Sequence, residues 1–478
     1  MQPIVFGVAI SSPSPPAVGG EGWGEEGRPA GGCAGISAVS CPSPRSFLPG
    51  RGSADRAPGT CGSLPSQSPR AWAFPLFLLA ALLRVDASDW PQFLGPTRDA
   101  VYAGPPLSED WGKEGPRVVW KKDMGEGYSG PVLADGKVVQ CHRIGGELIV
   151  QCFDAATGNE VWRFARATKF QDGAYFDSGP RPTPTIRDGK VFLHGTDGFV
   201  AALDFKTGHE VWSLHTKERF GLSGNWHGNV CSPLVTDNAV ILNVGSTNDA
   251  GIVAFDRESG RVLWQATRDK PSCASPMIAR LGGQPQLLVI TRSALRALDP
   301  ASGKEYWHWR TRKQSSGDVY AASPVVLGDQ VLLSGWYKLG MTLLNVSDGA
   351  AASVWESDDA ISAHYALPIV HGGFVYGYHG HGWERGGPTL RCVDLATGKL
   401  KWEQEKAGSG TIIRTGDNLL ILAETGELLL GKASPDGFKA TAHAQILGRT
   451  VRSYPAVADG FVYVKGPRQL VCIDLRKK

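Results

Sequence analysis

One short pattern recurs along this chain at intervals of roughly forty to fifty residues, a spacing typical of repeated β-sheet units. Its clearest copy, Ala202–Trp212, reads A-L-D-F-K-T-G-H-E-V-W. A weakened copy runs over Asn345–Trp355, and another, Gly431–Phe438, has lost the tryptophan. From its Asp to its Trp, the same frame returns at Asp154–Trp162, Asp256–Trp264, Asp299–Trp307 and Asp394–Trp402. Because one such unit cannot bury its apolar face alone, the repeat predicts like units packed side by side.

Each part of the pattern has a structural role. The alternating apolar residues before the Asp predict a strand that is buried at alternate positions. The Asp and Thr side chains can bond nearby backbone groups and the Gly tolerates positive φ, which predicts a tight turn. The next strand carries a tryptophan whose broad ring can pack against the neighbouring sheet. These docking tryptophans are Trp120, Trp162, Trp212, Trp264, Trp307, Trp355 and Trp402.

A Ser-Pro or similar pair precedes each copy and is followed by an apolar strand, a turn and a second apolar strand. Because proline has no N–H for a central ladder, it fits the first residue of the strand nearest the axis. The pairs are Gly130-Pro131, Thr183-Pro184, Ser232-Pro233, Ser275-Pro276, Ser323-Pro324, Leu367-Pro368 and Tyr454-Pro455.

Together these signatures predict an all-β fold, an eight-bladed β-propeller of four-stranded blades. The last blade begins at Ser453 and stops near Leu475, one strand short. Gly115–Lys122 is a lone tryptophan strand with no blade before it, and its pairing with the last blade would close the ring and remove exposed edges. Seven blades is the alternative, because the penultimate blade, Gly410–Leu447, is degenerate.

Over Trp90–Lys478 these residues resemble the pyrroloquinoline-quinone (PQQ) repeat superfamily, whose tryptophan docking motif is the pattern above. The opening Asp89–Asp99, D-W-P-Q-F-L-G-P-T-R-D, is similar to the lead-in of secreted bacterial members. The superfamily includes PQQ-dependent dehydrogenases and non-catalytic propellers, such as a subunit of the outer-membrane protein assembly machine. The resemblance implies the fold and leaves both functions open.

The resemblance also implies what a dehydrogenase would need. Quinoprotein alcohol dehydrogenases hold PQQ beside a disulfide between adjacent cysteines, with calcium and a catalytic Asp, whereas this sequence has no adjacent cysteine pair and no C-x-x-C-H motif. We therefore expect no catalytic residue, metal or cofactor, and interpret the chain as a scaffold that binds an envelope or secreted protein or a polymer. The alternative is a PQQ-dependent oxidoreductase of alcohols or sugars, with PQQ and calcium as cofactors.

The N-terminal part divides by composition. Residues 1–69 are rich in Pro, Gly and Ser, which predicts a disordered or mis-annotated leader. Residues 70–87 predict a secretory signal peptide cut after Ala87, with a buried anchor helix as the alternative. Residues 88–114 are a lead-in and residues 115–478 the propeller. We expect a periplasmic or secreted protein with no stable membrane span after cleavage.

The net charge restricts the expected partners, and the positions of the cysteines indicate which of them lie in the core. The net charge of +3 is small for 478 residues, and no basic cluster stands out, so we expect no nucleic-acid partner. Cys152, Cys392 and Cys472 share one slot of the repeat, where other copies have alanine, which predicts buried core thiols. Cys231 and Cys273 lie in equivalent inner strands of neighbouring blades and could form a disulfide.

The residues just before the proline pairs are expected to ring one mouth of the axial channel. Aromatic rings, cations and amides at a concave opening suit a small-molecule or peptide ligand, and a set of solvated rim residues is the alternative. The candidate ligand-binding residues are Tyr128, Arg181, Asn229, Tyr320, His364, Tyr365 and Arg452.

Three other groups carry a weaker indication. His379 and His381 would share one face of a strand and could begin a metal site with Glu384 or His364, against ordinary exposed histidines. Trp226 could stack on a flat ligand or cover a gap between blades.

Asp172 and Asp177 are the third group, and they could act as paired carboxylates in acid-base chemistry. They lie in a long connection that does not set their separation. No phosphate-binding glycine loop and no nucleophile-elbow motif is found in the sequence.

Overall fold

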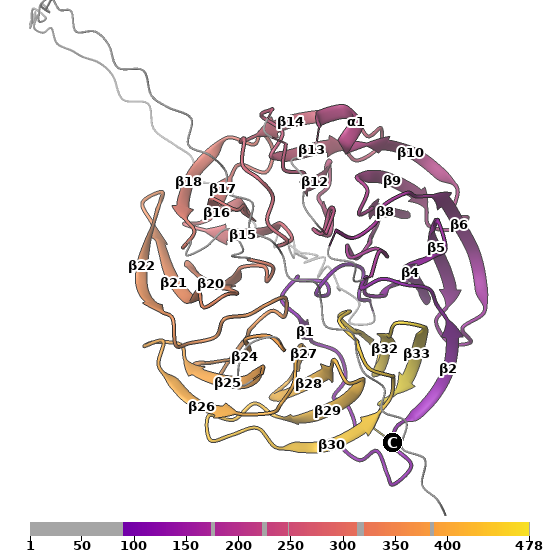
Figure 1. Ribbon diagram of the computed structural model, residues 1–478, viewed down its shortest axis with the longest axis vertical. Coiled ribbons are helices and arrows are strands. Elements are labelled where there is room, and N and C mark those ends of the chain that lie inside the picture. Colours follow the sequence, from indigo (N-terminus) through magenta and orange to yellow (C-terminus); the bar gives the residue numbers. More distant parts are fainter. Residues whose placement is uncertain are drawn as a thin grey trace, which may run out of the picture. The chain divides into compact units, whose positions relative to one another are not determined.

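The computed structural model describes residues 89–173, 177–221, 227–246, 248–312, 320–382 and 387–477, all within one compact unit, residues 80–478. Their strands form eight sheets in a ring, which Figure 1 shows along the axis. The predicted all-β, eight-bladed propeller is confirmed. The leader and the signal peptide lie outside the described residues, and the domain boundaries remain predictions.

In blades 1–7 four antiparallel strands follow chain order from the axis outward, whereas blade 8 takes its outermost strand from the N-terminal side of the propeller. Blade 1 contains β3 (Val132–Ala134), β4 (Lys137–Ile144), β5 (Glu147–Asp154) and β6 (Glu160–Ala167). Blade 2 contains β7 (Thr185–Arg187), β8 (Lys190–His194), β9 (Phe199–Asp204) and β10 (Glu210–His215). Blade 3 contains β11 (Leu234–Val235), β12 (Ala239–Asn243), β13 (Ile252–Asp256) and β14 (Val262–Ala266). Blade 4 contains β15 (Met277–Leu281), β16 (Gln284–Ile290), β17 (Ala294–Leu298) and β18 (Glu305–Arg310).

The second half of the ring repeats this order. Blade 5 contains β19 (Val325–Leu327), β20 (Gln330–Gly335), β21 (Gly340–Ser347) and β22 (Ala350–Ser357). Blade 6 contains β23 (Ile369–His371), β24 (Phe374–His379), β25 (Thr389–Asp394) and β26 (Leu400–Gln404). Blade 7 contains β27 (Gly410–Thr415), β28 (Asn418–Ala423), β29 (Glu427–Lys432) and β30 (Ala440–Gln445). Blade 8 contains β31 (Ala456–Ala458), β32 (Phe461–Lys465), β33 (Gln469–Asp474) and the N-terminal β2 (Arg117–Asp123).

The ring closes as the sequence predicts. β2 pairs antiparallel with β33, and Trp120 stands opposite Cys472. Blade 7 is a full blade although its pattern is degenerate, because Ala442 takes the tryptophan position opposite Leu430. The count is therefore eight blades and not the alternative seven.

The proline pairs mark the innermost strands with an offset of one residue. Pro131 directly precedes β3, Pro184 precedes β7 and Pro455 precedes β31. The proline therefore stands before the strand and not as its first residue. In that place its missing N–H removes no bond from the ladder.

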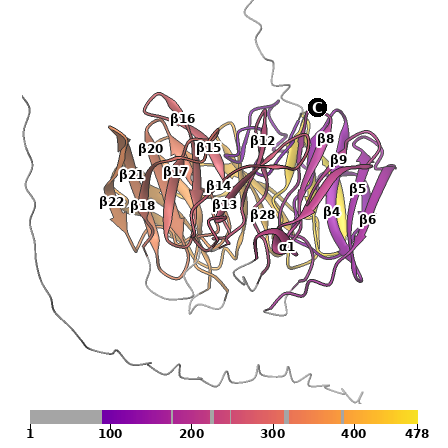
Figure 2. The same ribbon diagram turned by 90° about the horizontal axis from the view of Figure 1, so that it is seen from above.

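The two faces of the ring differ in what they carry. Because antiparallel strands alternate in direction, every innermost strand begins at the same face. We call it the mouth face, and it also carries the turns between second and third strands. The opposite turn face carries the other hairpins, including the Asp-Thr-Gly turns of the repeat. Figure 2 shows the ring from the side, with the short helix α1 (Thr216–Phe220), which follows β10, at the mouth face.

The tryptophans of the repeat join each blade to the next. Trp162 is buried and donates its indole N–H to the backbone oxygen of Phe205 in blade 2, at 2.8 Å. Gly208 of that turn has φ +74°, and a Cβ there would lie 2.6 Å from the Trp162 ring. Trp307 differs, because its indole bonds Gln286 of its own blade. Bonds like that of Trp162 are made by Trp120, Trp212, Trp264, Trp355 and Trp402.

A β-bulge stands beside each of these positions in the outermost strands. In β6, Trp162 pairs with Cys152. The next pair is Glu160 with Phe153, so Val161 is the extra residue, and it is 44% exposed. The same register shift occurs in the other blades. Bulges discourage an edge strand from pairing with another sheet, so the outer edge of each blade is protected.

A segment of the lead-in, Trp90–Tyr102, lies inside the ring, and we call it the axial segment. Trp90 exchanges backbone bonds with Leu133 of β3, and Pro91 accepts one from Ile186 of β7 at 2.7 Å. Its last two residues form β1 (Val101–Tyr102), which pairs parallel with β27 and appears near the centre of Figure 1.

Two side chains extend these contacts to further blades. Arg98, 5% exposed, donates to the backbone oxygen of Pro233 ahead of β11 at 3.1 Å. Phe93 packs edge-on against Tyr454 ahead of β31, with ring centroids 5.5 Å apart. The axial segment thus touches the innermost strands, or the residues leading into them, of blades 1, 2, 3, 7 and 8.

The cysteines behave as core residues. Cys152, Cys392 and Cys472 are fully buried, as their slot in the repeat predicts. No disulfide joins Cys231 and Cys273, so the disulfide considered for them is not formed. Cys231 lies instead 3.6 Å from His194 Nδ1 and 3.5 Å from the backbone oxygen of Asn243. In the described part of the chain, no helix is both long enough and apolar enough to span a membrane.

Candidate functional site at the mouth of the axial channel

Tyr128 stands at the centre of a polar network on the mouth face. It precedes β3, while Arg181 precedes β7 and Arg452 precedes β31, so the three come from neighbouring blades 1, 2 and 8. The guanidinium carbons of both arginines lie 5.7 Å from the Tyr128 ring centroid. All three side chains are half-buried. This arrangement places two cations against one aromatic ring ahead of the innermost strands of these three blades.

Arg181 is held on one side by a buried carboxylate. Its Nη2 donates to Asp172 Oδ2 at 2.5 Å, and the Asp172 side chain is fully buried. His227 Nδ1 lies 2.9 Å from the same oxygen. Arg181 Nη1 is also buried, and no hydrogen-bond partner for it is found in the described residues. Within the described residues, Nη2 of this guanidinium is therefore hydrogen-bonded and Nη1 is not.

Arg452 forms an ion pair with Glu424, but its Nε makes no hydrogen bond among the described residues. Arg452 Nε lies 3.0 Å from Glu424 Oε1. The Tyr365 hydroxyl donates to that oxygen at 2.9 Å. Burial, followed by the charge of Glu424, holds the pKa of Tyr365 well above its ordinary value. Tyr365 is therefore a neutral donor that keeps Glu424 in place.

Aromatic side chains continue the network beyond Tyr365. The His364 ring lies 4.1 Å from the Trp336 ring and 4.5 Å from the His381 ring, centroid to centroid. Tyr337 stacks on Trp336 at 3.6 Å and is 39% exposed. Burial, and then the positive charges of His381 and Arg452, lower the pKa of His364 well below its ordinary value. His364 is therefore a neutral imidazole at pH 7.

The turn that carries Tyr337 has an uncommon backbone. Tyr337 and Lys338 have φ of +63° and +62°, in the left-handed region that residues with a Cβ seldom adopt. Consecutive left-handed residues are found in tight hairpin turns, where Asn and Gly are preferred. Strain of this kind is often found at binding sites.

The structure brings together most of the residues that the sequence nominated. Tyr128, Arg181, His364, Tyr365 and Arg452 belong to the network described above. Asn229 instead turns its side-chain amide toward the backbone oxygen of Thr196, at 3.4 Å. The Tyr320 hydroxyl, on a buried side chain, lies 3.4 Å from the backbone oxygen of Arg312. Both of these contacts are made to backbone oxygens of nearby connections.

Several members of the network were missed or assigned other roles from the sequence. Glu424 and Trp336 were missed because they lie in turns between second and third strands, where no pattern repeats. Topology could have found them, since those turns lie on the same face as the starts of the innermost strands. Asp172 was considered as an acid-base group, whereas it is the partner of Arg181.

The weaker candidates are placed as follows. His379 Nδ1 is 3.1 Å from the Ser362 backbone N–H and 2.9 Å from Arg391 Nη1, whereas His381 lies against His364. The two imidazoles therefore have different neighbours. No group of three or more His, Cys, Asp or Glu side chains suited to a metal occurs in the described ranges. Glu384 and Trp226 lie outside those ranges.

Asp177 has its own set of partners. Its two oxygens accept the backbone N–H of Gly127 at 2.9 Å and of Gly179 at 2.7 Å. Asp172 is occupied by Arg181 and His227. Asp172 and Asp177 therefore have different bonding partners among the described residues.

Comparison with known proteins identifies the family of this chain. The family described as "Outer membrane protein assembly factor BamB" matches residues 109–226 and 149–404, which together span more than half of the chain. The chain belongs to this family. BamB of Burkholderia pseudomallei is 27% identical over 402 residues, covering 78% of this chain and 93% of that protein.

Dehydrogenases of the same superfamily are also similar. A quinoprotein ethanol dehydrogenase of Pseudomonas putida is 24% identical over 327 residues, covering 59% of this chain but 48% of that enzyme. The crystal structure of the quinohemoprotein alcohol dehydrogenase from Comamonas testosteroni matches with a TM-score of 0.62 at 16% identity, over 82% of this chain and 81% of that one. At this identity the structural likeness shows the propeller fold alone.

Proposed function

We propose that this protein is a non-catalytic binding propeller of the periplasm or the secreted fraction, which presents its mouth face to a protein or polymer partner. The observation that carries the proposal is the network around Tyr128, where half-buried charged and aromatic side chains from neighbouring blades meet at the channel opening. Sites of this composition, held on a rigid scaffold, are typical of recognition.

The family supports a partner from the cell envelope. BamB proteins are named as outer-membrane protein assembly factors, and the Burkholderia relative is covered almost in full. The dehydrogenase relative is covered over about half of its length. We therefore first test the hypothesis that the partner is an envelope protein or an envelope polymer.

A quinone with calcium fits the mouth poorly. Calcium takes several oxygen ligands, mostly from carboxylates and carbonyls. Asp172 and Glu424, the carboxylates of the network, are each paired with an arginine, at 2.5 Å and 3.0 Å. The sequence also has no adjacent cysteines to hold the quinone in the manner of the alcohol dehydrogenases. We derive no reaction through this cofactor, and the dehydrogenase relatives make it the alternative to test.

The first experiment separates the two functions. Residues 88–478 are titrated with PQQ, with and without calcium, while melting temperature and absorbance are followed, and dye-linked oxidation of alcohols and sugars is assayed. We expect neither a saturable stabilisation nor turnover, since a ligand that binds only the folded state must raise its stability. Calcium-dependent stabilisation together with turnover would replace the scaffold function by the oxidoreductase.

The second experiment tests the mouth face directly. Envelope extract is passed over immobilised wild-type protein, over Arg452→Gln, and over Arg257→Gln as a matched arginine control on the turn face. We expect the captured partner to be lost with Arg452→Gln and retained with Arg257→Gln. Equal capture by all three proteins would place the binding surface elsewhere.

A further inference from the structure

We propose that the mouth of the axial channel binds a neutral, hydroxyl-rich ligand, namely the end or a short stretch of a glycan chain. This inference rests on the proposed function, because it names the class of polymer that the mouth face would hold. It is argued from the balance of charge, the unused hydrogen-bonding groups, the aromatic surfaces and the closed axis.

Two of the positive charges at the mouth each lie against a carboxylate. Arg181 is bound to Asp172, and Arg452 to Glu424. Lys465 is nearby and buried, and its ammonium donates to the backbone oxygens of Gly125, Gly127 and Gly466. A highly charged ligand would have to break one of these pairs and leave a buried charge without its partner, at a large cost. A neutral ligand avoids that cost.

The mouth has both a donor atom and an acceptor atom for which no hydrogen bond is described. Arg181 Nη1 is a donor, and no acceptor for it is found among the described side chains and backbone. Glu424 Oε2 is an acceptor, because both contacts described for this carboxylate are made by Oε1. His364 Nδ1 is a further buried ring nitrogen with no partner in the described ranges. A hydroxyl both donates and accepts, whereas a carboxylate or phosphate ligand can only accept.

Aromatic surfaces accompany these polar groups. The Tyr128 ring lies within 5.7 Å of both guanidinium carbons, and the exposed Tyr337 is fixed by stacking on Trp336. Flat aromatic faces pack against the C–H faces of sugar rings, while planar polar side chains bond the hydroxyls at the ring edge. A rigid aromatic contact also costs little side-chain entropy on binding.

The axial segment limits how far a ligand can enter. Phe93 packs on Tyr454, which is two residues beyond Arg452 in the same connection. The Tyr454 hydroxyl in turn bonds the backbone N–H of Leu367 ahead of β23. The protein's own chain therefore lies next to the network on the axial side. A polymer cannot thread through the ring there, so only an end or a short stretch is bound.

The experiment uses residues 88–478 and a panel of defined probes: cellohexaose, maltohexaose and chitohexaose as neutral glycans, trigalacturonate as a charged one, and an acidic hexapeptide. Binding is measured by calorimetry and by tryptophan fluorescence. We expect saturable binding of at least one neutral hexasaccharide, with an affinity that changes less than about twofold between low and high salt, because no ion pair is formed with the ligand.

Variants locate the site. We expect Tyr337→Ala and Arg452→Gln each to weaken glycan binding by about tenfold or more, equivalent to the loss of roughly one good contact, and Arg257→Gln to bind as wild type. Tyr337→Ala removes an exposed ring, so it keeps the test valid if Arg452→Gln unfolds. Binding of trigalacturonate or the acidic peptide alone, with strong salt dependence, would overturn the inference in favour of an anion site.

Failure to bind any neutral glycan would also overturn the inference. Neither result would decide the proposed function, because partner capture by the mouth face can persist without glycan binding. Dehydrogenase turnover, by contrast, would remove the proposed function itself.

Discussion

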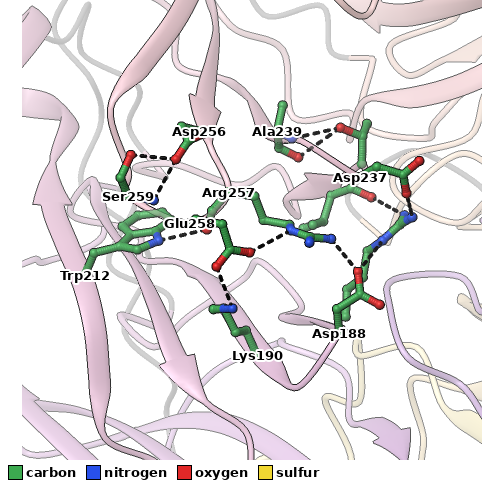
Figure 3. A network of polar contacts seen from close by, with 12 residues as sticks. Asp188, Lys190, Trp212, Asp237, Ala239, Asp256, Arg257, Glu258 and Ser259 are labelled. Atoms are coloured by element: carbon green, nitrogen blue, oxygen red, sulfur yellow. Dashed lines mark hydrogen bonds and ion pairs between the residues drawn. The ribbon is translucent and has the colours of Figure 1, made fainter.

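The two faces of the propeller both join neighbouring blades through charged groups, but they do so in different ways. On the turn face, Arg257 bonds Asp188 of the preceding blade and Glu258 next to it, and Lys190 lies 2.9 Å from Glu258 (Figure 3). The Asp188 and Glu258 side chains are mostly exposed. At the mouth, Asp172 is fully buried beneath Arg181. Exposed pairs contribute little to stability, whereas a buried carboxylate constrains its partner strongly.

The turn face is also the repeated face. Asp204 accepts bonds from the backbone N–H and the hydroxyl of Thr207, each at 2.8 Å, and Asp154 and Asp394 make the same bonds with the threonine three residues on. These bonds lower the pKa of Asp204. The mouth face repeats at the starts of the innermost strands, where the Thr183 N–H donates to the Ser232 hydroxyl and the Ser232 N–H to the Ser275 hydroxyl, each at 2.9 Å. The charged and aromatic groups of the network around Tyr128 do not follow that repeat. In this molecule repetition identifies the scaffold, and departure from it identifies the candidate site.

The largest effect that would test this comparison is the loss of a docking tryptophan. We expect Trp162→Ala to lower the free energy of unfolding by about 3–5 kcal/mol, because a large buried ring and its bond to Phe205 are removed. Urea unfolding measures it. Val161→Ala, on the exposed bulge residue next to it, should stay within about 0.5 kcal/mol.

Tyr128→Phe is the counterpart at the mouth and should change stability by less than about 1 kcal/mol. If Tyr128→Phe lowered the free energy of unfolding as much as Trp162→Ala does, the mouth network would stabilise the fold as strongly as the tryptophans do. The two faces would then not differ in their structural role.

The next effect concerns a buried histidine at the mouth end of β8. Burial lowers the pKa of His194 to about 4, from an ordinary value of 6.5. Between these pH values the unfolded chain binds the proton and the folded chain does not, so stability is lost as pH falls from 6.5 toward 4. The loss should approach about 3 kcal/mol for this group. Urea unfolding at a series of pH values measures it.

Substitution should reduce this acid sensitivity. His194→Gln should reduce the slope of the pH profile by the share of one group, because burial also lowers the pKa values of His142 and His379 to about 4. His209→Gln on the turn face controls for the removal of one imidazole. An unchanged slope in His194→Gln would mean that other groups govern acid unfolding.

Two glycines on the turn face separate close packing from backbone conformation. Gly208 and Gly189 both have φ of +74°, but a Cβ on Gly208 would meet the Trp162 ring at 2.6 Å, whereas Gly189 has nothing within 4 Å. We expect Gly208→Ala to cost about 1–3 kcal/mol more than Gly189→Ala, because only the first forces the indole to move. Equal losses would show that the left-handed turn alone accounts for the glycine.

The smallest expected effect is at the exposed network of Figure 3. Asp237 pairs with Arg187, and its side chain is 86% exposed. Asp237→Asn should therefore cost at most about 1 kcal/mol, and less at high salt. Thermal melting at two salt concentrations measures it. A larger and salt-independent loss would assign the turn-face charges a structural role as strong as that of the tryptophans.

Much of the fold and part of the site could be predicted because their signals are local. The Asp-Thr-Gly turn, the strand before it and the tryptophan after it lie within eleven residues, so the pattern is visible wherever a blade occurs. Tyr128, Arg181 and Arg452 were found because each lies shortly before a proline pair. Glu424 and Trp336 have no such marker, and Asn229 and Tyr320 have the right position but other neighbours.

By itself, the sequence predicted the repeated blades and the closing strand, with eight blades as the first count and seven as the alternative, because each of these features depends on a local motif. Only the tertiary structure decided that there are eight blades, that Trp90–Tyr102 lies inside the ring, that Arg181 and Arg452 share Tyr128, and that no disulfide joins Cys231 and Cys273. These contacts join residues of different blades, or of the lead-in and a blade. The repeat of the blades cannot predict these contacts, because each of them occurs only once among the described residues.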